Sequence, residues 1–247
     1  MWQQLWLRKV QSFLFGESQI ISHTMKSIAI VTGASRGIGL ELVKRLASKS
    51  IPVWATSRNS QEPIRQCEWV ALDLNSLESI NALKEKVKSS DVEIKYHINN
   101  SGFLVNKPFE DLSAEDFEQC YGVNVIGVAQ LIQKLMPYYS SDAHIVNIGS
   151  MGGVQGAQKF PGLSAYSSSK MALAGLTECL QEEMGERGWT FNYLALGAVQ
   201  TEMLTQAFPD FNAPLSPSEM AIYISDFVTS GSQYIRGKIL PVSRTTP

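Results

Sequence analysis

The chain has 247 residues, of which 44% are hydrophobic and 18% charged, and its net charge is −2. This composition excludes disordered and collagen-like classes, and the length suits one α/β domain with a large core. A near-neutral charge without a long basic run argues against a nucleic-acid partner, and no apolar stretch reaches the ~18 residues of a membrane span.

The first 24 residues differ from the rest. Apolar side chains recur there at near-helical spacing, and Arg8 and Lys9 interrupt them. This pattern fits an amphipathic surface or targeting helix, or an appendage ahead of a start at Met25. The low positive charge favours the appendage. We therefore expect residues 1–24 to be an N-terminal extension and residues 25–247 to form one domain.

From residue 27 onward, short apolar runs alternate with longer segments of helical period, which is typical of βαβ units and a parallel sheet. Helices are predicted between these runs, among them two long ones at residues 113–137 and 164–187. Seven strands are predicted, at residues 27–32, 51–57, 68–72, 94–99, 143–149, 190–196 and 237–243.

A glycine-rich turn, Thr32-Gly33-x-x-x-Gly37-x-Gly39, lies between the first predicted strand and the first predicted helix. This is the context that a dinucleotide-binding turn requires. Gly33 permits the tight turn, Gly37 lets the backbone approach a pyrophosphate, and the helix N-terminus offers free N–H groups. The sequence therefore predicts nucleotide binding.

The second predicted strand indicates which nucleotide is bound. NAD-binding proteins usually carry an acid at its end, but this chain has Ser57 followed by Arg58, and Arg36 lies in the glycine-rich turn. Two guanidinium groups without a carboxylate suit a 2′-phosphate. We expect NADP(H) to be preferred over NAD(H), although both arginines could instead be solvated.

A tyrosine and a lysine, Tyr166 and Lys170, lie four residues apart in a predicted helix and so share one face. A lysine ammonium beside a phenol stabilises the phenolate, which lowers the tyrosine pKa from about 10 towards neutral. Such a tyrosine can exchange a proton at physiological pH.

Together these motifs resemble the short-chain dehydrogenase/reductase family over residues 25–243. The motifs occur in the family's order: the glycine-rich turn, Asp73-Leu74, Asn99-Asn100-Ser101-Gly102, Asn124, Ser150, Tyr166 with Lys170, and residues 197–201. The resemblance implies a doubly wound Rossmann fold with helices on both faces of a seven-stranded parallel sheet. It also implies hydride transfer between a nicotinamide and a carbonyl or alcohol substrate.

The resemblance further implies a catalytic tetrad. Tyr166 would act as acid and base, Ser150 would polarise the substrate oxygen, Lys170 would assist Tyr166 and hold the ribose, and Asn124 would anchor a water. Cofactor contacts are expected at Gly33, Ser35, Arg36, Gly37, Ile38, Gly39, Arg58, Asp73, Leu74, Asn100, Gly102, Tyr166, Lys170, Gly197, Val199 and Thr201.

Several positions depart from the family's pattern. Ser101 replaces an alanine, and Leu196 replaces a proline before Gly197. The segment between Ser150 and Tyr166 is longer than usual, which enlarges the loop at residues 152–159 beside the expected substrate position. The segment at residues 202–215, the family's lid, is short and favours an open pocket.

The alternatives are a regulatory NADP(H) sensor without turnover and a Rossmann-like methyltransferase. A methyltransferase has no use for the Tyr166–Lys170 pair, and family members that act as sensors tend to lose one of the two. We expect a carbonyl reductase that forms a homodimer or homotetramer, as the resemblance implies. Three dispersed cysteines indicate a reducing, cytoplasmic location, and neither these cysteines nor the histidines are spaced as metal ligands.

Overall fold

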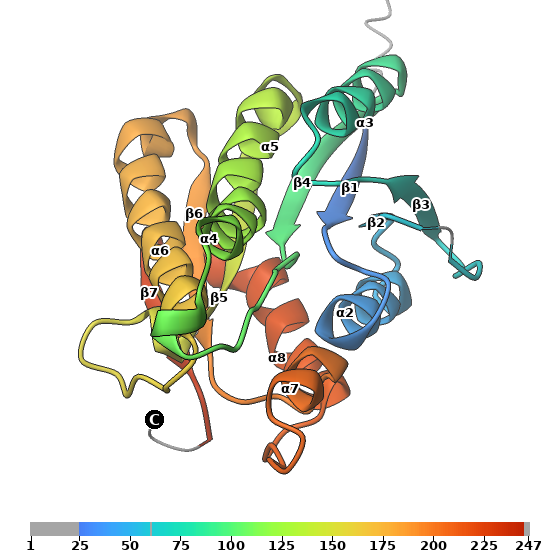
Figure 1. The fold of residues 1–247 in the computed structure, drawn as a ribbon. Helices are drawn as coiled ribbons and strands as arrows, with labels where there is room; N and C mark the ends of the chain where they lie inside the picture. The colour runs from blue at the N-terminus through green and yellow to red at the C-terminus, as the bar shows by residue number, and fades with distance from the viewer. Residues whose placement is uncertain (1–24, 60, 245–247) are drawn as a thin grey trace, which may run out of the picture.

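The computed structural model of the protein describes residues 25–59 and 61–244, so the predicted extension, residues 1–24, lies outside the described residues. Its centre is a seven-stranded parallel sheet with the strand order β3-β2-β1-β4-β5-β6-β7 (Figure 1). The strands are β1 (Lys26–Val31), β2 (Val53–Ser57), β3 (Cys67–Ala71), β4 (Val92–Asn99), β5 (Tyr139–Ser150), β6 (Thr190–Leu196) and β7 (Ile239–Val242). The strand order reverses between β1 and β4, as in a doubly wound fold, and the predicted fold class is confirmed.

Helices cover both faces of this sheet (Figure 1). On one face lie α2 (Gly37–Ser48) and α8 (Pro217–Ser230), with the short α7 (Glu202–Ala207) near the end of β6. The other face carries α3 (Leu77–Ser89), α4 (Ala114–Tyr121), α5 (Gly127–Leu135) and α6 (Ser164–Met184). Five described 3₁₀ turns complete the connections: Phe109–Asp111, Met136–Tyr138, Met151–Gly153, Gly185–Arg187 and Gly231–Gln233.

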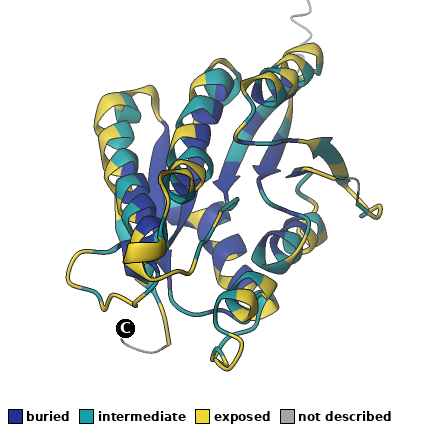
Figure 2. Ribbon diagram, viewed as in Figure 1, coloured by how far each residue is buried: buried dark blue, intermediate teal, exposed yellow. Residues whose placement is uncertain are grey.

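The alternation of side chains along the strands explains the two layers of helices. In β1, Ile28 and Ile30 pack into the core on the side of α3, α5 and α6, whereas Ala29 and Val31 pack on the side of α2 and α8. Successive side chains of a strand point to opposite faces, so a central strand that is apolar throughout needs cover on both sides. Figure 2 accordingly shows buried strands enclosed by helices whose outer surfaces are exposed.

The helix starts follow local capping chemistry. The Ser113 and Ser216 side chains each accept a hydrogen bond from the backbone N–H three residues on, and Asp116 and Glu219 complete the two capping boxes. Ser76 caps α3 in the same way without a reciprocal acid. Each such cap stabilises its helix by about 1 kcal/mol.

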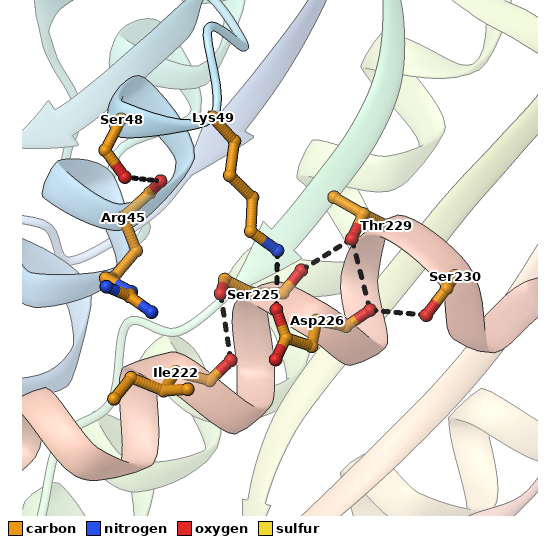
Figure 3. Close-up of polar contacts among 8 residues, drawn as sticks. All are labelled: Arg45, Ser48, Lys49, Ile222, Ser225, Asp226, Thr229 and Ser230. Carbon is orange, nitrogen blue, oxygen red and sulfur yellow. Dashed lines mark hydrogen bonds and ion pairs between the residues drawn. The ribbon is translucent and has the colours of Figure 1, made fainter.

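The contact between α2 and α8 fixes one edge of the molecule. Lys49, just after α2, forms an ion pair with Asp226 of α8 at 2.6 Å, and Figure 3 shows the Arg45 side chain extending from α2 towards α8. Because the Asp226 carboxylate is exposed, the ion pair contributes little, and the packing of Leu42, Leu46 and Ile224 holds the two helices together.

The structure corrects the predicted helix at residues 113–137. A π turn, Gly122–Ile126, separates α4 from α5, and a 3₁₀ turn follows α5. A Cβ at Gly122 would lie 2.6 Å from Asn75 Oδ1, and one at Gly127 would lie 2.5 Å from the carbonyl oxygen of Leu74. The helix backbone thus presses against the loop that follows β3, and the wider turn lies where this close approach occurs.

Strand boundaries differ by up to four residues from prediction. β5 begins at Tyr139 rather than residue 143, because Tyr139 pairs with Ile94 ahead of the polar Ser140 and Asp142. β7 begins at Ile239 rather than residue 237, since Gly237 adopts a positive φ of 66° and cannot extend the strand. None of the helices in the described part of the chain has the length and apolarity to cross a membrane.

Candidate active site

The glycine-rich turn connects β1 to α2 with the backbone that its sequence demands. Gly33 and Gly37 have φ values of +64° and +56°, a region that favours glycine. A Cβ on Gly39 would lie 2.3 Å from the carbonyl oxygen of Gly33, so the turn is closed too tightly for a side chain there. The turn therefore leaves the N-terminus of α2 uncovered, which is the arrangement that binds phosphate groups.

Asn100, at the end of β4, braces this turn from the neighbouring strand. Its Nδ2 donates to the carbonyl oxygens of Thr32 and Gly33, both at 3.0 Å, and its backbone N–H donates to Thr32 Oγ1. Asn100 thus joins the switch point between β1 and β4 to the glycine-rich turn. The sequence predicts a cofactor contact for Asn100, and the structure shows that Asn100 braces the turn.

A cavity of about 620 Å³ runs along the carboxyl edge of the sheet. This edge is where open α/β sheets bind their ligands. Every residue that the sequence predicted to contact the cofactor lines it: Gly33, Ser35, Arg36, Gly37, Ile38, Gly39, Arg58, Asp73, Leu74, Asn100, Gly102, Tyr166, Lys170, Gly197, Val199 and Thr201. Ser150 lines it too, so the cavity joins the glycine-rich turn to the predicted catalytic residues.

Two arginines lie at one end of the cavity, where β2 and the glycine-rich turn form its wall. Arg36 and Arg58 are exposed, and neither forms an ion pair with any residue in the described ranges. Asp73 lies nearby, where its Oδ1 accepts the backbone N–H of Asn75 at 2.9 Å. The two guanidinium groups are therefore available to an anion.

The Tyr166–Lys170 pair lies on one face of α6, as the spacing predicted. Lys170 Nζ is 5.9 Å from the centre of the Tyr166 ring and donates to the carbonyl oxygen of Ile148, on β5, at 2.9 Å. Lys170 is only 3% exposed, whereas Tyr166 is half-buried and faces the cavity. The ammonium is thus held between the tyrosine and the end of β5.

The acid–base properties of this pair differ from the sequence-based expectation. Burial raises the pKa of Tyr166 to about 12, although a hydrogen bond with Ser150 lowers it in part. Burial lowers the pKa of Lys170 to about 8. In the protein without cofactor, the pKa of Tyr166 is thus raised rather than brought towards neutral, because loss of water outweighs the hydrogen bond with Ser150.

Ser150 ends β5 and turns the chain into the Met151–Gly153 turn. Its Oγ accepts the backbone N–H of Gly152 at 3.2 Å, which leaves the hydroxyl hydrogen free to donate. The hydroxyl lies beside the Tyr166 phenol, whose pKa it affects. Two hydroxyl donors therefore meet at one place in the cavity, which is the arrangement needed to bind a carbonyl oxygen.

Asn124 is the predicted tetrad member that does not line the cavity. It is fully buried in the π turn, and its Oδ1 accepts the backbone N–H of Phe103 at 2.8 Å. Its Nδ2 donates to the carbonyl oxygen of Phe103 and to Ser169 Oγ, each at 2.9 Å. The side-chain amide is thus occupied in joining α6 to the loop after β4, and its sequence position alone could not reveal these partners.

The substrate end of the cavity is mainly apolar. Its walls come from the loops after β4 and β5 and from the lid segment, and the apolar side chains are Leu104, Met151, Phe160, Leu163, Met203, Leu204, Phe208 and Phe211. Gln158, in the enlarged loop, and Gln119 bring polar side chains to this wall. The loop folds on itself, since Lys159 Nζ donates to the carbonyl oxygens of Val154 and Ala157.

The lid segment forms a short helix, α7. The Thr201 side chain accepts the backbone N–H of Leu204 at 3.2 Å and so caps α7 at the edge of the cavity. Asn106 Nδ2 donates to the carbonyl oxygen of Ala207 at 2.7 Å and ties this lid to the loop after β4. Sequence reasoning missed Asn106, because its asparagine amide has no local motif.

The histidines within the described ranges lie away from this cavity. His97, inside β4, bonds to the hydroxyl of Tyr139 at the start of β5, and His144 bonds to Val228 and Asn192 between β5, β6 and α8. Residues 25–59 and 61–244 contain no group of three or more side chains suited to hold a metal ion. His23 lies outside the described residues.

The glycine-rich turn, the Tyr166–Lys170 pair and the parallel sheet with its cavity define the class: this chain belongs to the short-chain dehydrogenase family. The model of that family, described as short chain dehydrogenase, matches residues 27–212. Members of this class are oxidoreductases that act on CH–OH and C=O groups with a nicotinamide cofactor, and the chain is accordingly an enzyme of this type.

Particular relatives have related activities. The chain is 29% identical to the L-2,3-butanediol dehydrogenase of Corynebacterium glutamicum, with 88% of this chain and 97% of the relative covered. It is 32% identical to a diacetyl reductase [(S)-acetoin forming] of Staphylococcus aureus, with 73% and 74% covered. A solved 3-ketoacyl-(acyl-carrier-protein) reductase from Brucella melitensis, complexed with NADH, has a TM-score of 0.79 at 24% identity, with 90% and 98% covered.

Proposed function

We propose that this protein is an NADP(H)-dependent carbonyl reductase in which Tyr166 is the proton donor. The observation that carries the proposal is the placement of Ser150, Tyr166 and Lys170 in one cavity with the glycine-rich turn and two arginines that form no ion pair within the described ranges. A glycine-rich turn without these three side chains, or a tyrosine–lysine pair without the turn, occurs in other proteins. Their joint presence in one cavity supports hydride transfer to a carbonyl carbon.

The residues that would hold the cofactor fit a dinucleotide phosphate. Gly33, Gly37 and Gly39 leave the N-terminus of α2 open to a pyrophosphate, and the side-chain-free backbone there admits a close approach. Arg36 and Arg58 would bind the 2′-phosphate through charge-assisted hydrogen bonds. When bound, NADPH supplies the hydride.

The chain's own residues then act on the substrate oxygen. The Ser150 hydroxyl donates a hydrogen bond to the carbonyl oxygen and so polarises the carbonyl group. Tyr166 donates its phenolic proton to that oxygen as negative charge develops there, and Lys170 stabilises the phenolate that remains. Asn124, by fixing Phe103 and Ser169, keeps the loop after β4 and the Lys170 helix in place.

The raised pKa of Tyr166 keeps the phenol in the protonated form that reduction requires. With a pKa of about 12, the phenol is protonated at neutral pH and ready to donate. Oxidation needs the phenolate, which becomes accessible only when nearby positive charge lowers the pKa. Lys170 supplies part of that charge, and the oxidised nicotinamide would add to it. Cellular NADPH pools are mainly reduced, which agrees with this direction.

The substrate would be a carbonyl compound or the corresponding alcohol with an apolar body. The eight apolar side chains named above for the cavity wall would surround that body, and few polar groups would orient it. The butanediol dehydrogenase and diacetyl reductase relatives act on small oxygenated compounds by their names, so vicinal diketones belong in any substrate panel.

Assembly into a homodimer or homotetramer is part of this proposal. Ile126, beside α5, and Met171, on α6, are exposed apolar side chains on the two long helices of the same face of the sheet. A second copy that pairs these helices would cover them. The cytoplasmic location stays a prediction.

The test is NADPH oxidation with a panel of diketones, ketones, aldehydes and quinones, with NADH in parallel. Tyr166→Phe should lower kcat by about 10²- to 10⁴-fold, because it removes the proton donor. The NADPH affinity should stay within about twofold of the unmodified protein. Tyr234→Phe is the matched control, since Tyr234 is 82% exposed and does not line the cavity.

Each outcome separates the candidate functions. Turnover with NADPH that Tyr166→Phe abolishes and Tyr234→Phe preserves supports the proposal. Tight NADPH binding without turnover on any panel compound would favour the regulatory sensor, which needs no proton donor. Equal rates with NADH would refute the proposed cofactor preference while leaving the reaction intact.

A further inference from the structure

A buried tyrosine of β6, Tyr193, connects two of the proposed catalytic residues through their backbones. Its ring is fully buried between the sheet and α6. Its hydroxyl accepts the backbone N–H of Ser150 at 3.1 Å and donates to the backbone carbonyl oxygen of Lys170 at 3.0 Å. One hydroxyl therefore joins Ser150, the last residue of β5, to Lys170 in the first half of α6.

A second bond closes a ring around this contact. Lys170 Nζ donates to the carbonyl oxygen of Ile148, two residues before Ser150. Lys170 is consequently bonded to the end of β5 in two ways. Its ammonium bonds directly to Ile148, and its backbone carbonyl is linked to Ser150 through the Tyr193 hydroxyl. Asn147 Nδ2 of β5 also donates to Thr177 Oγ1 of α6 at 2.8 Å, but Thr177 lies two helical turns beyond Lys170, so Tyr193 and Lys170 make the polar connections next to Ser150.

The neighbouring strand has a residue that makes room for the tyrosine. A Cβ on Gly149 would lie 1.7 Å from Tyr193 Cζ and 1.9 Å from its hydroxyl oxygen, so any side chain at position 149 would collide with the ring. Gly149 has no positive φ that would require glycine. Its lack of a side chain is explained by the Tyr193 ring, and the two residues form a complementary pair.

We propose that Tyr193 is a positioning residue, which sets the distance between Ser150 and the Tyr166–Lys170 pair through its hydroxyl. This inference rests on the proposed roles of those three residues. Ser150 sits on a strand and Tyr166 on a helix, so their separation depends on how α6 packs against β5. Two hydroxyls must meet on one substrate oxygen, and a displacement of about 1 Å can reduce turnover about 10²-fold.

The chemistry of the buried phenol suits a permanent link. Burial raises the pKa of Tyr193 well above its usual value, so the group keeps its proton and donates to Lys170 at any pH at which the fold exists. An unmade bond here would leave a backbone N–H without this partner at the end of β5. The link therefore does not switch with pH, in contrast to the titratable pair that it positions.

Tyr193→Phe tests the role, because it keeps the ring that fills the space over Gly149 and removes only the hydroxyl. Tyr139→Phe is the matched control, since its hydroxyl bonds to His97 at 2.7 Å at the other end of β5. For both variants, we would measure the Tm, the NADPH affinity, kcat and KM for reduction, and the pH profile of alcohol oxidation.

We expect Tyr193→Phe to lower kcat about 10- to 100-fold with KM and NADPH affinity within about threefold. The limb of the oxidation profile on which activity rises with pH should move to higher pH, because a looser Lys170 stabilises the Tyr166 phenolate less. Tyr139→Phe should lower the Tm similarly and leave kcat and the pH profile unchanged. Equal behaviour of the two variants in all four measurements would overturn the proposal.

Amide hydrogen exchange on the unmodified protein keeps the inference testable if Tyr193→Phe does not fold or if no substrate is turned over. The Ser150 amide should exchange as slowly as the core amides of β5, such as that of Ile148, because the buried hydroxyl is its partner. Fast exchange at Ser150 beside slow exchange at Ile148 would refute the link. Absence of turnover in the unmodified protein would count against the proposed function instead.

Discussion

Acidification from pH 6.5 to pH 5 should destabilise the fold through two buried histidines. Burial lowers the pKa of His97 to about 3 and that of His144 to about 4. The unfolded chain binds a proton at each histidine below about pH 6.5, whereas the folded chain does not, so stability falls as the pH falls through this window. The two histidines stop lowering the stability only near pH 3 to 4, where the folded chain binds the same protons.

The size of the effect follows from the proton balance. Each pH unit costs about 1.4 kcal/mol for each proton that only the unfolded state binds. At pH 5 this amounts to about 2 kcal/mol for each histidine and about 4 kcal/mol for the two together. Because whole domains are stable by about 5 to 15 kcal/mol, the loss should be large.

Urea denaturation followed by circular dichroism at pH 7, 6 and 5 measures this loss. The ion-paired carboxylates do not account for a loss of stability between pH 7 and pH 5. The pKa values of Asp142 and Asp226 are lowered in the folded protein, so the stability that these carboxylates contribute is lost only below about pH 4. His97→Asn should reduce the pH dependence by about half, because it removes one of the two titrating groups. A free energy of unfolding that is flat from pH 6.5 to 5 would refute the reasoning.

Two further substitutions test the cofactor cavity. Gly39→Ala places a Cβ 2.3 Å from the carbonyl oxygen of Gly33, and it should weaken NADPH binding at least tenfold and destabilise the fold by about 1–3 kcal/mol. Gly175→Ala, at an exposed position of α6 outside the cavity, is its control, because nothing in this chain lies within 4 Å of a Cβ there, and NADPH affinity should stay unchanged. An unchanged NADPH affinity in Gly39→Ala would contradict the proposed binding turn. Arg58→Asp should shift the ratio of kcat/KM values from NADPH towards NADH, since it replaces a phosphate ligand with a carboxylate that suits a ribose hydroxyl. An unchanged ratio would mean that Arg58 does not bind the 2′-phosphate.

Sequence patterns predicted the sheet well because its strands are defined locally. Apolar runs such as that of β1, bounded by turn residues, mark buried strands whatever their neighbours are, and all seven predicted strands are present. The boundaries were less certain: β5 starts with Tyr139 because Ile94 of another strand pairs with it. That pairing is a tertiary fact, and the polar residues 140–142 conceal it.

The site was predictable where a motif fixes both the residue and its local backbone. The residues of the glycine-rich turn and the Tyr166–Lys170 pair, which their motifs identify in the sequence, line one cavity in the structure. The π turn at Gly122–Ile126 was not predictable, because its apolar spacing continues that of the flanking helices. The glycines at and beside this turn leave room for the loop after β3, which is distant in sequence. Tyr193 could be read only as a core residue of a strand, since its hydroxyl's partners lie on β5 and α6.

The bracing of the glycine-rich turn by Asn100 makes the conformation of the turn depend on a residue more than 60 positions later in the chain. A nascent chain that ends with β3 contains all three glycines and both arginines, yet β1 then lacks its neighbour β4 on one side. The carbonyl oxygens of Thr32 and Gly33 gain their Asn100 partner only after β4 crosses the sheet and pairs with β1. The bonds that brace the turn therefore require the chain through Asn100, and a chain that ends with β3 lacks them although it contains the whole glycine motif.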